Sequence, residues 1–294
     1  MLQCIFWVAN VLCVKTYCIF AHIQVNKTTY SNFTIFTTMK KSSFLAFLFI
    51  AVTQWAMAAE RDFYQIQTYR LSDKAQEVRM DKYLKTAYLP ALHRAGIKTV
   101  GVFKPIASDT AAGNQIMVLV PLTSPDQLDK LQTTLAADAT YQTAGADVLK
   151  APHTNVAFAR KQSTVLKAFK DAPRMFAPKF TTKRADQVFE LRSYEGATEY
   201  LYSQKVKMFN EGGEIALFKK LGFNPVFFAE VLSGNVMPNL MYMISFSNME
   251  SHDTHWDAFG KHPDWKKMSS LDEYQNTVSN IIRVMYHPTD YSDL

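Results

Sequence analysis

Glu190, Arg192 and Tyr194 are the side chains in this sequence whose types and spacing best suit catalysis. They alternate with apolar or small residues, so a strand would place all three on one face. A guanidinium binds an anionic or carbonyl group through two hydrogen bonds, and a carboxylate or phenol can exchange a proton with a bound molecule. We therefore predict a catalytic set in which Arg192 anchors the substrate and Glu190 or Tyr194 serves as base or proton donor.

An earlier stretch, Tyr64–Tyr69, has the same alternation and carries polar residues on the matching face. A buried Glu or Arg without a partner is costly, so such side chains must pair or meet water. Either this polar face lines a ligand cavity, or Glu190 and Arg192 form a structural ion pair that fills the core. The residues that the first interpretation predicts to contact a ligand are Gln67, Tyr69, Tyr242, His255 and Trp256.

A histidine-rich segment around residue 255 is the densest polar cluster. His252 and His255 are three residues apart on a predicted helix, and Pro263 and Asp264 predict a new helix start with His262 near its N-cap. A metal site would need a third ligand, and an exposed helix face explains the same residues. We therefore predict no metal and no cofactor, with a haem held by His255 or His262 as the alternative.

Four short matches recur at a nearly constant offset of 124–126 residues, which indicates an internal repeat. Four matches in register are hard to obtain by chance. The paired segments are Tyr64–Tyr69 with Phe189–Tyr194, His93–Val100 with Lys219–Val226, Ile116–Leu122 with Leu240–Phe246, and Thr154–Val156 with Ser279–Ile281.

Each repeat has the element order strand, helix, strand, strand, helix, strand, which is the ferredoxin-like βαββαβ unit. The first unit covers residues 62–160, the second covers 187–289, and residues 161–186 connect them. The predicted strands are 63–70, 98–106, 115–122 and 154–160 in the first unit and 188–194, 224–232, 239–247 and 279–286 in the second, and the second helical stretches are 124–137 and 249–260.

Helices cover one face of each such sheet, so the two bare faces can pack against each other. The predicted fold class is therefore α+β, with two tandem ferredoxin-like units that close an intrachain pseudo-dimeric α/β barrel. We expect the apolar strand faces to pack on the helices and the polar faces to line the space between the two sheets.

The second unit resembles the NIPSNAP family of the dimeric α/β-barrel superfamily. The residues that carry the resemblance are Phe189–Tyr194, Gly222-Phe223, Trp256-x-x-Phe259 and His262–Trp265. The first unit matches only the fold pattern and lacks both tryptophans, so we interpret it as a diverged copy. The resemblance implies the fold and leaves the chemistry open, because the superfamily includes cofactor-free monooxygenases, decarboxylating or isomerising enzymes and haem proteins.

Two functions from different classes follow. The first is a small-molecule pocket between the two sheets, with an oxygenase-like or isomerase-like activity that needs no cofactor. The alternative is a non-catalytic binding or interaction protein whose barrel is filled. The sequence leaves open whether the protein is an enzyme and whether copies of it associate through their helix faces.

Residues 39–58 have the order of a secretory signal peptide. Two lysines precede an apolar run at 44–52, and an Ala-Met-Ala cleavage site ends at Ala58. The apolar run is too short to span a bilayer as a permanent helix. We expect a secreted or periplasmic protein after cleavage near Ala58, with no membrane span in the mature chain.

Residues 1–38 are apolar and contain no acidic side chain. Either translation begins at Met39 and this stretch is a start-site extension, or it is an additional membrane segment near residues 1–25. We favour the first interpretation because signal peptides normally lie at the N-terminus.

The net charge of +6 is unevenly distributed. Residues 1–58 hold four basic and no acidic side chains, so the remainder has 28 basic and 26 acidic residues. This small excess disfavours nucleic-acid binding. All three cysteines precede residue 20, so the mature chain can form neither a disulfide nor a thiolate site.

Overall fold

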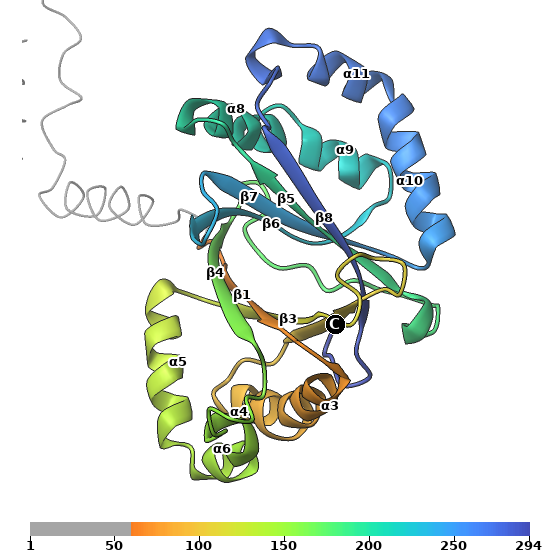
Figure 1. Ribbon diagram of the computed structural model, residues 1–294. Coiled ribbons are helices and arrows are strands. Elements are labelled where there is room, and N and C mark those ends of the chain that lie inside the picture. The colour runs from red at the N-terminus through yellow and green to blue at the C-terminus, as the bar shows by residue number, and fades with distance from the viewer. Residues whose placement is uncertain (1–59) are drawn as a thin grey trace, which may run out of the picture. The chain divides into compact units, whose positions relative to one another are not determined.

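A computed structural model describes residues 60–294, which fold into a closed barrel of eight strands with helices outside it (Figure 1). The strand order around the barrel is β1-β3-β2-β8-β5-β7-β6-β4. This order contains two four-stranded sheets, one from each half of the described chain, and it confirms the predicted α+β barrel. The start-site extension predicted at 1–38 and the signal peptide predicted at 39–58 lie outside the described residues.

The first half contains the strands β1 to β4 and the helices α3 to α7. In chain order its elements are β1 Phe63–Arg70, α3 Lys74–Tyr83, the π-helix η1 Leu84–Tyr88, α4 Leu89–Arg94, β2 Gly101–Pro105, β3 Gln115–Leu122, α5 Pro125–Ala137, α6 Ala139–Ala144, α7 Ala146–Leu149 and β4 Arg160–Ala168.

The second half repeats this order with the strands β5 to β8 and the helices α8 to α11. Its elements are the 3₁₀ turn η2 Arg184–Asp186, β5 Val188–Glu195, α8 Glu199–Asn210, α9 Glu214–Lys220, β6 Asn224–Ser233, β7 Asn239–Phe246, α10 Met249–Lys261, α11 Pro263–Ser269, the 3₁₀ turn η3 Asp272–Tyr274 and β8 Asn280–Pro288.

Polar cap residues fix where the longer helices begin. The side chains of Asp73, Ser124, Thr198 and Asn248 each accept a hydrogen bond from the backbone N–H three residues later. Such a bond satisfies one of the free N–H groups in the first helical turn. The caps of α5 and α10 are 124 residues apart, which fixes the register between the two halves.

Two seams join the halves into one barrel. β2 of the first half pairs antiparallel with β8 of the second, with Phe103 opposite Pro288. β4 of the first half pairs antiparallel with β6 of the second, with Leu166 opposite Val231. Each half therefore supplies both of its edge strands to the other, and closure leaves neither sheet with an unpaired edge.

The last strand of the first half lies later in the sequence than predicted. β4 spans Arg160–Ala168 in place of 154–160, so part of the predicted connector is strand. β8 begins 120 residues after β4, whereas β5 begins 125 residues after β1. The first half is therefore longer between its third and fourth strands, and the match between Thr154–Val156 and Ser279–Ile281 was misleading.

The predicted direction of the strand faces was wrong. Phe103 and Phe189 meet inside the barrel with ring centroids 4.9 Å apart, in a core of apolar side chains from both sheets. Glu190, Arg192 and Tyr194 point outward to the helices of their own half. Alternation separates the two faces of a strand, but both faces are covered here, so it could not show which face meets the other sheet.

Candidate functional site

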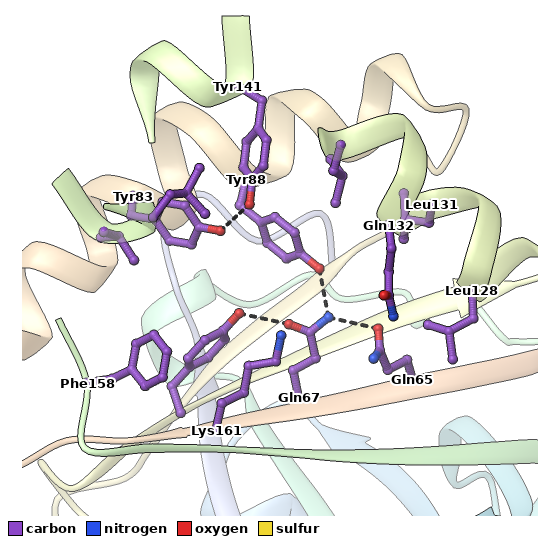
Figure 2. A pocket seen from close by; sticks show the side chains of 14 residues that line it. Gln65, Gln67, Tyr83, Tyr88, Leu128, Leu131, Gln132, Tyr141, Phe158 and Lys161 are labelled. Carbon is purple, nitrogen blue, oxygen red and sulfur yellow. Dashed lines mark hydrogen bonds between the residues drawn. The ribbon is translucent and has the colours of Figure 1, made fainter. Parts of the chain in front are cut away.

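A cavity of about 460 Å³ lies in the first half, between the outer face of β1 and β4 and the helices that cover it (Figure 2). Its volume is within the range of small-molecule sites. The apolar side chains of the lining come mainly from α5 and α7. The polar side chains, here called the polar wall, come from the strands, α3, η1, α5 and α6. The apolar residues from the two helices are Leu128, Leu131, Leu135, Val148 and Leu149.

Two glutamines form the centre of the polar wall. Gln67 Nε2 donates to Gln65 Oε1 at 2.8 Å and to the Tyr88 hydroxyl at 2.7 Å. The Tyr69 hydroxyl donates to Gln67 Oε1 at 2.8 Å, and Gln65 Nε2 donates to Ser163 Oγ at 2.8 Å. Gln67 is buried, so these bonds fix its amide and with it the positions of both phenols.

A π-helical turn places the next two tyrosines. The Leu89 N–H donates to the carbonyl of Leu84, five residues back, immediately before Pro90. A proline has no N–H to continue the α-helical ladder, and the wider turn absorbs this break. Bonding between residues five apart also brings Tyr83 and Tyr88 together, and their rings stack with centroids 5.9 Å apart and planes at 13°.

Tyr141 of α6 completes the tyrosine group. Its hydroxyl lies 2.5 Å from the hydroxyl of Tyr83. Burial raises the pKa of Tyr69, Tyr83, Tyr88 and Tyr141 above the usual value for a phenol. All four hydroxyls therefore keep their protons at neutral pH, and any of them without an acceptor can donate to a bound molecule.

Lys161 of β4 is the one charged residue among those that line the cavity. Its ammonium lies 5.7 Å from the centroid of the Tyr69 ring. The residue is exposed overall, and nearby protein atoms displace part of the hydration of its charged end. This loss of hydration lowers the pKa of Lys161, which favours an anionic partner or the neutral amine.

Three positions that border the cavity in the first half carry larger side chains in the second. The caps of α5 and α10 are 124 residues apart, as are the starts of β3 and β7, and the starts of β1 and β5 are 125 residues apart. In this register Gln132 corresponds to Trp256, Leu135 to Phe259 and Tyr141 to Trp265. Phe259 and Trp265 are 4.6 Å apart between ring centroids, so the larger rings are in contact. We attribute the cavity to the loss of side-chain volume at these positions.

Glu190 and Arg192, the first two members of the predicted catalytic set, form a buried ion pair against α10. Arg192 Nε donates to Glu190 Oε1 at 2.7 Å, and Trp256 Nε1 donates to Glu190 Oε2 at 2.7 Å. The Arg192 guanidinium carbon lies 3.5 Å from the centroid of the Trp256 ring, in a cation–π contact. Only 1% of the Glu190 side chain and 11% of the Arg192 side chain are exposed.

Tyr194 belongs to the same cluster. Its hydroxyl lies 2.8 Å from that of Tyr242 and accepts a hydrogen bond from Arg192 Nη1 at 3.4 Å. The rings of Tyr194 and Tyr242 both pack on Phe209. The predicted set is thus brought together, but its members bond to one another, which favours the structural interpretation. Their catalytic role stays a prediction.

The histidines of α10 have different surroundings. His252 Nε2 lies 3.4 Å from Glu190 Oε2, an ion-pair distance without hydrogen-bond alignment, and His252 Nδ1 lies 2.7 Å from Asp253 Oδ1. His255 Nδ1 bonds to the backbone carbonyl of Ser251 at 2.6 Å. His262 is the N-cap of α11, as predicted. No group of three or more His, Cys, Asp or Glu side chains that could hold a metal ion occurs in the described part of the chain.

The surroundings of His252 predict a pH-dependent stability. Burial opposes its charged form, but the carboxylates of Glu190 and Asp253 outweigh burial and raise the pKa of His252. The pKa of histidine in the unfolded chain is about 6.5. A higher pKa in the folded protein adds stability at pH values below 6.5, and this stability is lost as the pH rises through the folded-state pKa. The free energy of unfolding should therefore fall above pH 6.5 in the native protein and fall less in His252→Gln.

Urea unfolding of both proteins at pH 6 and pH 9 checks this expectation. The remaining titratable groups are common to the two proteins, so the difference between their pH profiles isolates His252. Parallel profiles would contradict a charged His252 beside Glu190.

The ligand-contact residues predicted from the sequence divide between the two halves. Gln67 and Tyr69 line the cavity, whereas Tyr242, Trp256 and His255 belong to the packed core of the second half. Most residues that line this cavity were not predicted from the sequence. The signal that could have pointed to them was the register of the repeat, in which Gln132 stands where the second half has a tryptophan. The missed polar lining residues are Tyr83, Tyr88, Gln132, Tyr141 and Lys161.

Within residues 60–294 there is no helix that combines the length and the apolar character needed to span a bilayer. A search of curated proteins finds no match. Solved structures do match, and a proposed monooxygenase from Lactobacillus acidophilus is 10% identical with a TM-score of 0.52, covering 78% of this chain and 94% of that chain.

A second proposed monooxygenase, from Fusobacterium nucleatum, is 6% identical with a TM-score of 0.52, covering 78% of this chain and 93% of that chain. A NIPSNAP family protein from Agrobacterium tumefaciens is 16% identical with a TM-score of 0.32, covering 37% of this chain and 98% of that chain. At these identities the first two structures show the barrel fold and nothing finer.

The family comparison concerns the second half. The NIPSNAP family model matches residues 189–293, which run from β5 through β8, the last strand, to Asp293. This range contains the strand, turn and Trp-x-x-Phe segments noted in the sequence. The second half of the barrel is therefore a NIPSNAP domain.

Proposed function

We propose that the protein binds a small organic molecule in the cavity of the first half. One observation carries the proposal, namely a cavity of about 460 Å³ whose polar wall is held in place by buried hydrogen bonds. The position differs from the pocket predicted between the two sheets, because an apolar core fills most of that space and leaves a smaller cavity of about 180 Å³ there. The NIPSNAP half is then the packed half of the barrel, and its strands pair with the edge strands of the half that binds the ligand.

We further propose an oxygenase-like reaction that needs no cofactor. The two barrel structures from Lactobacillus and Fusobacterium, both proposed monooxygenases, support this class by fold alone. Within the cavity, Lys161 is the group suited to act as a base, because desolvation lowers its pKa. It would take a proton from an acidic C–H of the substrate, and the resulting carbanion would add to O₂.

The step balances without an additional reductant. The proton returns to the peroxide oxygen to give a hydroperoxide, and loss of water then leaves a ketone at the former CH₂ carbon. One O₂ is consumed and one water is released. The Tyr88 hydroxyl would donate a hydrogen bond to the substrate oxygen where negative charge develops.

Native mass spectrometry of residues 60–294 with a panel of two-ring aromatic compounds tests the binding proposal, and an oxygen electrode tests turnover. We expect retained compounds and oxygen uptake with those that contain an acidic CH₂ group. Retention without oxygen uptake would leave a binding protein and overturn the reaction. No retained compound would overturn both.

A further inference from the structure

The cavity offers more hydrogen-bond donors than its own acceptors can use. The Tyr88 hydroxyl accepts a bond from Gln67 Nε2, and its own proton has no acceptor among the described residues. One of the Tyr83 and Tyr141 hydroxyls donates its proton to the other, and the hydroxyl that accepts keeps its own proton without an acceptor within residues 60–294. At least two phenolic O–H groups are therefore free to donate to a ligand.

The charge of the cavity is positive, so it favours the same kind of ligand group as the free O–H donors. Its lining contains the Lys161 ammonium and no carboxylate. Within the part of the chain that the structure describes, Lys161 makes no ion pair with an acidic side chain, unlike Lys205, whose ammonium lies 2.8 Å from Glu214. Figure 2 shows the Lys161 side chain reaching toward Gln67 and into the space below Tyr88. An anion would complete the contacts that the protein leaves open.

The aromatic lining of the cavity favours a flat molecule. Tyr83 and Tyr88 stack on each other, and the Tyr88 and Tyr141 rings lie 6.2 Å apart between centroids. Phe158 packs edge-on against Tyr69 at 5.2 Å. Aromatic walls opposite the leucines of α5 favour a planar ring system, since aromatic pairs gain energy beyond the area that they bury.

We propose that the ligand is a planar aromatic molecule whose oxyanion is held by the Lys161 ammonium and the free Tyr88 hydroxyl, the ammonium being the form that Lys161 takes once it has accepted a proton as the proposed base. The inference rests on the proposed binding function and adds the chemical class of the ligand. A carboxylate and a phenolate share this chemistry, and both accept charge-assisted hydrogen bonds.

Matched probes separate charge from shape. We would measure, by isothermal titration calorimetry at pH 8, the affinities of 2-naphthoate and its neutral amide, and of 4-nitrophenolate and its neutral methyl ether. Each anion should bind about tenfold or more tightly than its neutral partner, the loss expected for one charge-assisted bond. The pair with the larger ratio of anion affinity to neutral affinity identifies the carboxylate or the phenolate as the preferred source.

Three variants then assign the preference to residues. Lys161→Met should weaken anion binding about tenfold to a hundredfold and leave neutral binding unchanged, while Lys161→Arg should keep most of the preference. Tyr88→Phe should weaken binding of both classes about fivefold. Lys167→Met is the matched control, because Lys167 lies on the same strand over the Phe63 ring and outside the cavity lining.

The outcomes distinguish this inference from the proposed function. If neutral probes bind as tightly as anions, or if Lys161→Met and Lys167→Met behave alike, the anion inference is overturned while ligand binding stands. If no probe binds to the folded native protein, checked by circular dichroism, both are overturned.

Discussion

Replacement of Gln132 by tryptophan should strongly weaken ligand binding in the first half while the fold is kept. The corresponding residue of the NIPSNAP domain is Trp256, whose indole N–H bonds to Glu190 on the strand below. A tryptophan at position 132 can reach Gln65 in the same way and occupy the cavity. We expect the affinity for 2-naphthoate to fall about a hundredfold or more, or about 2.8 kcal/mol.

The control for this variant is Thr133→Trp, which adds the same side chain one position along α5, outside the cavity lining. Its affinity should equal that of the native protein. Calorimetry gives the affinities, and thermal unfolding shows whether each variant is folded. Native affinity in a folded Gln132→Trp protein would show that the ligand binds somewhere other than this cavity.

Removal of the Arg192 guanidinium should strongly destabilise the protein. Arg192→Ala leaves the Glu190 carboxylate, 1% exposed, without its closest cationic partner. It also removes the contact with the Trp256 ring. Loss of one partner of a buried pair costs about 3–5 kcal/mol of unfolding free energy. Affinity for a ligand in the first half should not change, since these residues lie outside the cavity lining.

Urea unfolding checks the size of this effect, with Lys220→Ala as control. Lys220 and Asp264 form an ion pair whose side chains are both 58% exposed, so its loss should cost at most about 1 kcal/mol. A stable Arg192→Ala protein that no longer binds ligand would restore the catalytic assignment of Glu190, Arg192 and Tyr194.

The sequence predicts the architecture well because the alternation within each strand and the register of the repeat can both be read directly from the residues. Seven of the eight strands lie within a few residues of their predicted ranges, and the helix start at Pro263 follows from local capping. The exception, β4, was displaced because the repeat changes length between β3 and β4, and three residues at 154–156 were too few to fix a register.

The candidate site was harder to predict because it depends on long-range packing. Glu190, Arg192 and Gln67 occupy the face predicted to be polar, but the sequence does not state which covering layer that face meets. Tyr88 enters the cavity through a π-helical turn that no simple periodicity describes. Whether space remains beneath α5 is decided by differences in side-chain volume between the halves, such as Gln132 against Trp256.

The two seams of the barrel have an evolutionary consequence. In a symmetric dimer of identical chains, every substitution appears twice, so a change that opens one cavity also opens the other. Here β2 meets β8 and β4 meets β6 within a single polypeptide, and the two sides of the barrel can diverge independently. One side can carry smaller residues in place of tryptophans and so contain a cavity. The aromatic rings on the other side remain packed, so the barrel keeps the stability that this second side contributes.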